Sequence, residues 1–230
     1  MTEQGTLPSR PEADSAALVV HRIAVIAMLA VLLGFTMQGL ILGAKLLAGG
    51  PFPGTKLFVD LTQGITWSVL ICAGVGIGTA IMKVRAALAG LIAALFAPIA
   101  LAVAKSAQKV VASAIGVVDQ PAALSLVTIS GLRALEYGIL GWALASLVQK
   151  EAKGAPAYLG TGSAVGIVFG GAIAALGYHA ASLAGQTPAA AQIAASLVNE
   201  IVSPIGCALV IYCGQLIGRN VGMLSGRGAA

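Results

Sequence analysis

The sequence predicts an all-α, polytopic integral membrane protein with six transmembrane helices. Two observations lead to this fold class. The chain is 58% hydrophobic and only 9% charged, whereas a typical soluble domain carries about 25% charged residues. Several uninterrupted apolar runs also reach the ~20 residues that a helix needs to cross about 30 Å of hydrocarbon. A mean hydropathy of +0.96 agrees with both observations.

Breaks rich in Gly, Pro and charge divide the apolar sequence into its elements, taken in chain order. A polar segment over 1–18 is predicted to be a disordered tail, and the run that begins near Val19 is too long for a signal-peptide core. The later helices are separated by "GGPFPGTK", "KVR", "GVVDQP", "KEAKGAP" and "GQTP". The transmembrane domain is expected over 19–222, with a flexible tail over 223–230. The expected helices are 21–47, 59–82, 86–115, 122–149, 157–183 and 190–218.

The distribution of basic residues predicts the orientation. Lys and Arg are concentrated in cytoplasmic loops of membrane proteins, and eight of them fall on the side that carries both termini, against four on the other side. We therefore expect both termini in the cytoplasm and the chain in a bacterial inner membrane. The eight are Arg10, Arg22, Lys83, Arg85, Lys150, Lys153, Arg219 and Arg227, and the four are Lys45, Lys56, Lys105 and Lys109.

A weak repeat with a period of about 65 to 73 residues suggests three two-helix hairpins. The second helix of each hairpin begins with polar residues, and the first carries a basic or titratable residue near its far end. Each hairpin is thus expected to bring a base toward an acid. Any six-helix chain can be divided in this way, so the repeat stays open. The proline-acid-x-x-basic signature of mitochondrial carriers, which also have three such units, is absent from all three hairpins, so no family is assigned.

Arg133 and Glu136 lie inside the fourth apolar run. They are three residues apart, so they share a helix face and can pair. Arg133 precedes the basic stop at Lys150 by 17 residues, about 25 Å of helix, which places both charges within the hydrocarbon. Ionisable residues at such depth are costly and usually face the bundle interior. Three interpretations stay open: a structural pair between helices, a substrate or ion pathway, and contact with a partner subunit.

Four further polar residues are candidates for the same pathway. In the second helix Asp60 and Gln63 are near the start, where a carboxylate also suits the positive end of the helix dipole. In the sixth helix Glu200 follows Asn199, one turn before Pro204, which frees a backbone carbonyl near position 200. For Glu200, a site and an interfacial carboxylate are equally consistent with the sequence.

Lys105, Lys109 and His179 form a candidate vestibule on the non-cytoplasmic side. The two lysines are four residues apart in the third helix and are expected to face the same way. They can extend toward lipid headgroups or attract anions. His179 follows Tyr178 near the end of the fifth helix and is expected at the interface.

Glycines spaced four apart predict surfaces where helix backbones approach closely. Whether these surfaces pack within one chain or between copies is left open by the sequence. They are Gly39 and Gly43, Gly74 and Gly78, Gly162, Gly166 and Gly170, and Gly214, Gly218 and Gly222.

The sequence favours two classes of function. The first is a small channel or transporter with a polar site inside the membrane. The second is a non-enzymatic transmembrane subunit of a larger membrane assembly. No metal site, cofactor or nucleic-acid partner is expected, because Cys and His do not cluster at ligand spacing and no basic patch is interleaved with aromatics. An enzyme is not expected, because no nucleophile, base and acid set is evident. Membrane lipids and either identical copies or other membrane subunits are the expected partners.

Overall fold

A computed structural model describes residues 10–80, 85–117, 124–152 and 154–227. The described part is helical, without strands, in agreement with the predicted fold class. The fifth expected helix is one continuous rod in three parts, because a π-helical turn, η1, joins α5 to α6. The elements are α1 Arg10–Leu47, α2 Lys56–Ala80, α3 Ala86–Ala114, α4 Leu126–Gln149, α5 Ala155–Val165, η1 Gly166–Gly170, α6 Gly171–Leu183 and α7 Ala190–Arg227.

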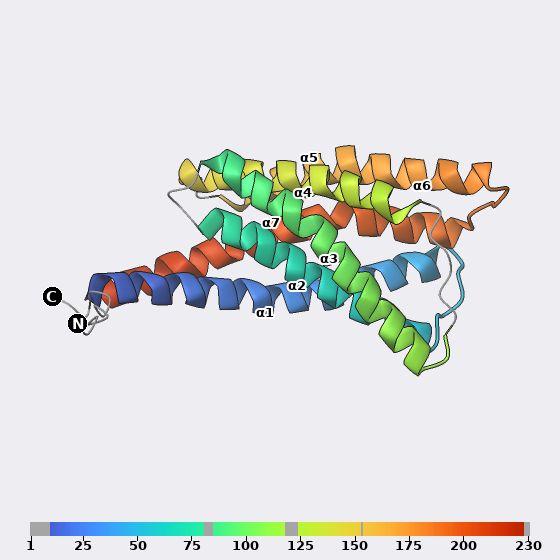
Figure 1. Cartoon of the computed structure of the whole chain (residues 1–230), viewed down its shortest axis with the longest axis horizontal. Helices are drawn as coiled ribbons and strands as arrows, with labels where there is room; N and C mark the ends of the chain where they lie inside the picture. The colour runs from blue at the N-terminus through green and yellow to red at the C-terminus, as the bar shows by residue number, and fades with distance from the viewer. Residues whose placement is uncertain (1–9, 81–84, 118–123, 153, 228–230) are drawn as a thin grey trace, which may run out of the picture.

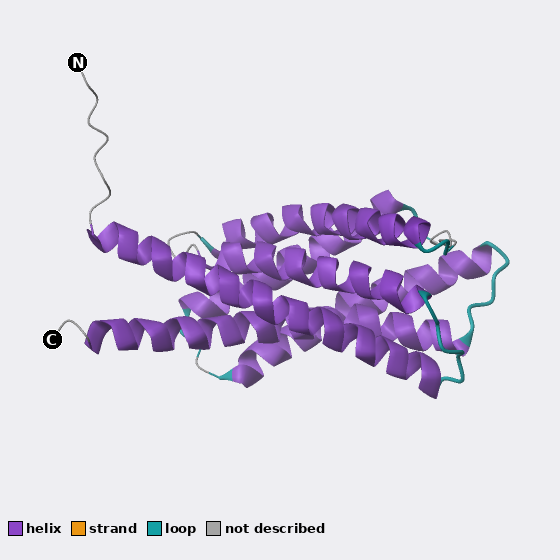
Figure 2. Cartoon of the chain, turned by 90° about the horizontal axis from the view of Figure 1, so that it is seen from below, coloured by secondary structure: helices purple, strands orange, loops and turns teal. Residues whose placement is uncertain are grey.

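The rods run alternately in opposite directions along one long axis (Figures 1 and 2). Both ends of the chain lie at one end of the bundle, which we call the terminal end. The connections from α1 to α2 and from α6 to α7 lie at the other end, which we call the loop end. Pro51 and Pro53 in the first of these connections, with Gly54 at a φ of +59°, stop α1 from continuing into α2.

Each rod packs against its neighbours in the sequence, and the last rod packs against the first. Thus α1 contacts α2, α2 contacts α3, α3 contacts α4, α4 contacts α5, α5 contacts α7, and α7 contacts α1. The second helix of each hairpin, namely α2, α4 and α7, also contacts the other two. These three helices therefore supply the side chains at the centre of the bundle.

Five helical segments of the described residues are long and apolar enough to cross a membrane: 23–47, 56–80, 86–114, 155–183 and 190–217. Helix α4 has 24 residues and is not among them. Its interior carries Arg133 and Glu136, which lower its mean hydropathy. The helices are those of a membrane protein, and six crossings are not confirmed.

Two helices extend farther than the sequence predicts. Helix α1 begins at Arg10 and so includes 10–18, for which the sequence predicts a disordered tail. Ala16, Ala17 and Leu18 are strong helix formers, and their propensity favours continuation of the helix. Helix α7 likewise continues to Arg227, through part of the expected flexible tail. Residues 1–9 and 228–230 lie outside the described residues.

The closest backbone contact in the bundle joins the third hairpin's two rods. A Cβ atom placed on Gly162 would lie 2.9 Å from the Pro204 carbonyl oxygen, and one on Gly166 would overlap the Ile201 carbonyl oxygen. A Cβ atom on Gly170 would overlap the Glu200 carbonyl oxygen. Pro204 lacks the N–H that would bond to this carbonyl within α7. The glycine face therefore lies directly on the turn of α7 in which Pro204 removes a backbone hydrogen bond.

The other predicted glycine surfaces divide into two groups. Gly74 lies against Phe96 and Gly78 against Ala89, and Gly214 lies against Ile26, so these positions are packed within the chain. Gly39 and Gly43 have no atom within 4 Å of an added Cβ, so the expected close approach is not found there within the chain. Their surface on α1 faces outward. The side chains near Gly218 and Gly222 lie outside the described residues.

Substitution of Gly166 with Ala is expected to lower the free energy of unfolding by about 1–3 kcal/mol, because the added methyl overlaps the rigid α7 backbone. Denaturant titration in detergent micelles measures this change. Gly171→Ala is the matched control, because nothing lies within 4 Å of its added Cβ and Ala is the better helix former. Equal stability of the two variants would show that the close contact is absent.

Candidate functional site: a polar cavity above a buried ion cluster

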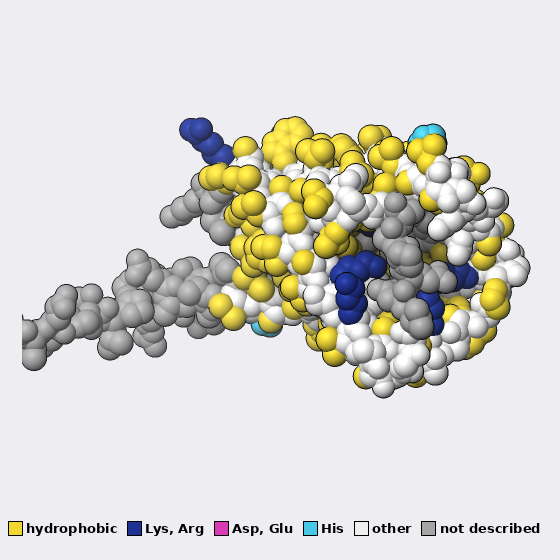
Figure 3. All heavy atoms as spheres, turned by 45° about the vertical axis from the view of Figure 1, so that its right-hand side comes forward, with side chains coloured by type: hydrophobic (Ala, Val, Ile, Leu, Met, Phe, Trp, Pro, Cys, Tyr) yellow, Lys and Arg dark blue, Asp and Glu magenta, His cyan; other side chains and the backbone are white. Residues whose placement is uncertain are grey.

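The central helices and α1 enclose a cavity of about 250 Å³ toward the loop end. Its wall is mainly polar, although apolar helices surround it. Figure 3 shows Lys and Arg side chains gathered on the face of the molecule at the loop end. The lining residues are Gln38, Ile41, Lys45, Lys56, Asp60, Gln63, Gly64, Trp67, Leu101, Ala104, Arg133, Ala195, Ser196 and Asn199.

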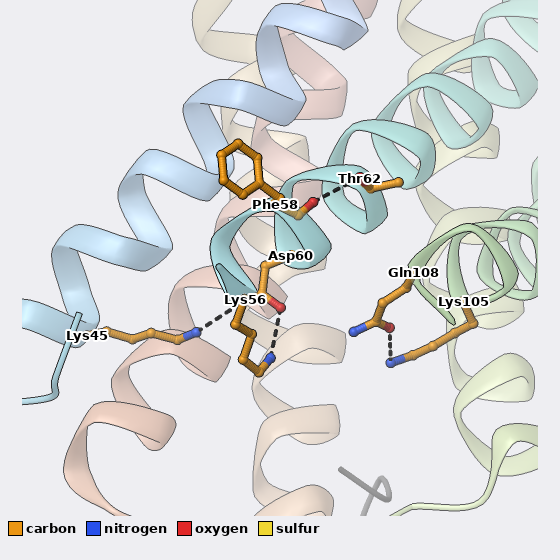
Figure 4. Close-up of polar contacts among 7 residues, drawn as sticks. All are labelled: Lys45, Lys56, Phe58, Asp60, Thr62, Lys105 and Gln108. Carbon is orange, nitrogen blue, oxygen red and sulfur yellow. Dashed lines mark hydrogen bonds and ion pairs between the residues drawn. The ribbon is translucent and has the colours of Figure 1, made fainter. Parts of the chain in front are cut away.

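Ion pairs between α1 and α2 hold one side of the cavity mouth. Lys56 Nζ donates to Asp60 Oδ1 at 2.9 Å, and Lys45 Nζ lies 3.6 Å from Asp60 Oδ2 (Figure 4). The spacing of four residues places Lys56 beside Asp60 on the helix surface. Lys45 reaches the same carboxylate from the last turn of α1. These three charges sum to +1 and are partly exposed, with 27%, 42% and 17% of the Lys45, Lys56 and Asp60 side chains accessible.

Helix α3 adds a further cation to this region. Lys105 Nζ donates to Gln108 Oε1 at 3.0 Å, and Figure 4 shows both side chains beside α2 and its ion pairs. Gln108 is buried and Lys105 is half-buried. Together with Lys45 and Lys56, this lysine makes the mouth electropositive.

Gln38 brings an amide from α1 into the cavity wall. An added Cβ on Gly64 would overlap the Gln38 Nε2 atom, so the bare glycine leaves room for this side chain. Gln63 and Asn199 add amides from α2 and α7, and Ser196 adds a hydroxyl. Such groups can bind a polar solute by hydrogen bonds without adding net charge.

The cavity ends on Arg133, which is paired with two carboxylates. Arg133 Nη1 donates to Glu136 Oε2 at 2.7 Å, one turn along α4. Arg133 Nη2 lies 2.5 Å from Glu200 Oε2 on α7, in an ion pair that is not aligned as a hydrogen bond. Asn199 Nδ2 donates to Glu200 Oε1 at 3.0 Å. We call Arg133, Glu136 and Glu200 the ion cluster. All three side chains are buried, and Glu136 is completely inaccessible.

Aromatic rings from α2 and α4 cover the ion cluster. The Arg133 guanidinium carbon lies 5.2 Å from the centre of the Trp67 ring, the geometry of a cation–π contact. Trp67 in turn meets Tyr137 edge to face, with ring centres 5.5 Å apart. These contacts desolvate the guanidinium while retaining favourable electrostatics. The bound arginine therefore has one face against a ring and its two terminal nitrogens against carboxylates.

Apolar side chains fill the centre of the bundle between the ion cluster and the terminal end. Ile71, Val75, Leu140, Leu144 and Ile211 are almost completely buried there and belong to one contiguous core. The cavity thus opens toward one end of the bundle only. The ion cluster forms the floor of the cavity.

The structure brings most of the predicted pathway residues together. Arg133 and Glu136 pair as their spacing predicts, and Lys45 meets Asp60 as expected for the first hairpin. In the third hairpin the expected pairing is wrong, because Glu200 pairs with Arg133 of the second hairpin and not with His179.

None of the three vestibule candidates lines the cavity, although Lys105 lies close to the ion pairs at its mouth (Figure 4). Lys109 and His179 are exposed and absent from its wall. His179 occupies an exposed position of α6, after the π turn η1. Lys109 does not share the half-buried environment of Lys105.

Several residues of the site were not singled out by sequence. Trp67 lies four residues after Gln63, so their shared helix face is a usable signal. Gln38 is a polar residue inside an apolar run, and this is a second usable signal. Lys56 lies four residues before Asp60, a spacing that also places both charges on one helix face, whereas Ser196 has no distinguishing pattern.

Comparison of the chain with protein-family models, with curated proteins and with solved structures finds no match. The chemistry of the site must therefore be argued from its own residues.

Replacement of Arg133 with Gln is expected to lower the free energy of unfolding by about 3–5 kcal/mol, because it removes the cation that pairs with the buried carboxyl groups of Glu136 and Glu200. Denaturant titration in micelles measures the loss. The triple variant with Gln at 133, 136 and 200 is expected to recover much of it, since no charge remains. Lys109→Gln is the surface control and should change stability by no more than about 0.5 kcal/mol. An Arg133→Gln protein as stable as wild type would contradict the charge pairing.

Proposed function

We propose that this protein is a small integral membrane transporter or channel, and that its solute binds in the cavity above the ion cluster. One observation carries the proposal: a cavity of about 250 Å³ reaches from the loop end to a buried, charged floor in an apolar bundle. Membrane proteins bear the cost of such residues where a solute or ion must be bound inside the bilayer. A bundle that needed only packing would be more stable with apolar residues there.

The proposal includes six membrane crossings, with α4 as the shielded one. Helix α4 lies between α3 and α5 and contacts α2 and α7. Its two charged side chains belong to the ion cluster, while Leu135, Ile139 and Trp142 are exposed on its outer surface. The lipid therefore meets apolar side chains on this helix too. The excess of basic residues places both termini in the cytoplasm, which opens the cavity to the opposite side of a bacterial inner membrane.

The half of the bundle between the ion cluster and the terminal end is closed, which favours a transporter over an open channel. An open pore needs a continuous polar route, whereas Leu140, Leu144 and Ile211 close the centre below the ion cluster. In a transporter the solute reaches the other side after the helices rearrange, and the cavity then opens the other way. The turn of α7 at Pro204, beside η1, is the irregular segment nearest to the floor.

The cavity wall indicates a small polar solute. Amides of Gln38, Gln63 and Asn199 can donate and accept hydrogen bonds, and the lysines at the mouth attract solutes with an anionic group. The volume suits a compact metabolite more than a lipid or a peptide.

Labelling of a cysteine at position 63 tests the cavity as the solute route. In a Cys213→Ala background, Gln63→Cys protein in proteoliposomes is expected to react with a charged, membrane-impermeant methanethiosulfonate reagent from the loop end only. The attached group fills the cavity, so uptake should fall at least about tenfold. Uptake is first measured for a panel of radiolabelled organic anions, zwitterions and neutral solutes.

Lys109→Cys is the matched control, because position 109 is exposed at the same end but does not line the cavity. Its modification should leave uptake unchanged. Full uptake after quantitative labelling of position 63 would show that the solute does not use the cavity. Absence of uptake for every solute in the panel would count against transport.

A non-enzymatic subunit of a membrane assembly is the second candidate. The observation that favours it is the outward glycine surface of α1, where Gly39 and Gly43 have no neighbour in the chain and Phe35 and Leu32 are exposed. Small residues of this kind commonly lie at contacts between transmembrane helices.

Purification of the tagged chain from its native membrane in mild detergent distinguishes the two functions. A subunit is expected to elute with other chains in fixed ratio, and Gly39→Leu with Gly43→Leu should release them. A monodisperse particle that contains only this chain, and that retains solute uptake, would contradict the subunit function.

A further inference from the structure

We propose that the ion cluster holds one exchangeable proton, on Glu136, and that solute movement through the cavity is coupled to this proton. The first part concerns the cluster alone. The second part rests on the proposed transport function.

The charges of the ion cluster do not balance when all three groups are ionised. Arg133 contributes +1, and Glu136 and Glu200 contribute −2, which leaves one negative charge in the buried centre. The mouth has the opposite excess of +2 from Lys45, Lys56, Lys105 and Asp60, but those side chains are partly open to water and are screened. One proton bound to a carboxylate makes the cluster neutral. Because a buried unpaired charge is far costlier than a neutral acid, the protonated form is favoured.

The contacts favour Glu136 over Glu200 as the protonated residue. Glu200 has a partner at each oxygen, because Oε1 accepts a hydrogen bond from Asn199 and Oε2 lies in the ion pair with Arg133, although that pair is not aligned as a hydrogen bond. Glu136 uses only Oε2, and its Oε1 is buried without a hydrogen-bond partner in the described part of the chain. A bare carboxylate oxygen in an apolar site is the atom that gains most from a proton.

The groups that face Glu136 supply no second cation. The charges that act on it are those of Arg133 and Glu200. Next to it along α4, Tyr137 has uncharged neighbours, namely Trp67 of α2 and Ser203 and Cys207 of α7. Helix α5 and η1, which also pack against α4, contain no Lys, Arg, His, Asp or Glu. The α3 residues that line the cavity nearby, Leu101 and Ala104, are apolar. Farther toward the mouth, Lys105 is engaged with Gln108.

A proton fits the cluster better than a metal cation. No group of three or more His, Cys, Asp or Glu residues that could hold a metal occurs among the described residues. The Arg133 guanidinium already occupies the space between the two carboxylates. A proton needs no coordination shell, and it adds only an O–H bond.

The binding step is a simple proton transfer. A hydronium ion in the cavity gives its proton to the less buried Glu200, and the proton passes to Glu136 as the Arg133 contacts exchange. The products are a neutral Glu136 carboxylic acid and one water molecule. The reverse step releases the proton when the centre opens to the other side.

Infrared difference spectroscopy of the full chain in detergent tests the bound proton without any transport assay. Wild-type protein at neutral pH is expected to show one C=O band of a buried carboxylic acid, shifted in heavy water. Glu136→Gln and Glu200→Gln should each lose this band, because one carboxylate then balances Arg133. Asp60→Asn is the control and should keep it. Absence of the band from wild type, or its survival in Glu136→Gln, would overturn the proposal.

Thermal unfolding locates the proton. Gln closely matches a neutral Glu side chain, so Glu136→Gln should unfold at the wild-type temperature. Glu200→Gln forces Glu136 to ionise with Oε1 unpaired, and its Tm should fall by about 4 °C or more. A larger loss for Glu136→Gln than for Glu200→Gln would place the proton on Glu200 and overturn the assignment.

Proteoliposomes that contain a trapped pH dye test the coupling. Wild-type protein is expected to move protons when a transported solute is supplied at zero membrane potential, and an acid loop-end medium should accelerate uptake severalfold. Glu136→Gln should exchange solute across the membrane but move no protons. Solute uptake without proton movement, or uptake that requires sodium, would overturn the coupling and leave the proposed transport function intact. Absence of any uptake, with the infrared band present, would instead contradict transport.

Discussion

The central constraint on this structure is that charges inside an apolar bundle must be neutralised by the protein itself. Arg133 meets this constraint through Glu136 on its own helix, Glu200 on α7 and the Trp67 ring on α2. Removal of any of these helices from the centre would leave a charged group against lipid. The ion cluster therefore explains why α2, α4 and α7, and not the first helices of the hairpins, meet at the middle of the bundle.

The backbone contact between α7 and the rod formed by α5, η1 and α6 also helps to keep the buried charges neutralised. Glu200 can reach Arg133 only where α7 is held at a defined depth, and Gly166 and Gly170 lie on the carbonyls of Ile201 and Glu200 themselves. A side chain at either glycine would push α7 away from its neighbour. The irregular carbonyls beside Pro204 remain protected from lipid because glycine leaves no gap. One segment of α7 thus supplies both the backbone that packs on the glycines and a carboxylate of the charged floor.

Much of the fold could be predicted from the sequence, because Gly, Pro and charged residues interrupt the apolar runs where the helices end. The pairing of Arg133 with Glu136 follows from their spacing on one helix. Contacts between hairpins could not be predicted, since hydropathy is nearly uniform around each helix and does not specify which rods meet. For this reason Glu200 was expected to meet a base of its own hairpin, whereas it pairs with Arg133 of the second hairpin. The π turn η1 could not be predicted either, because a π turn has no reliable sequence pattern in a stretch such as "GIVFG".

The π turn has a geometric consequence for long-range packing. On a regular α-helix, residues four apart drift by about 40° around the axis, so a ridge of glycines at this spacing winds away from any straight partner. The π turn η1 has more residues per turn, so residues four apart on it rotate less around the axis. This smaller rotation cancels part of the drift. Gly162, Gly166 and Gly170 consequently form a nearly straight track, and α7 can follow it without supercoiling.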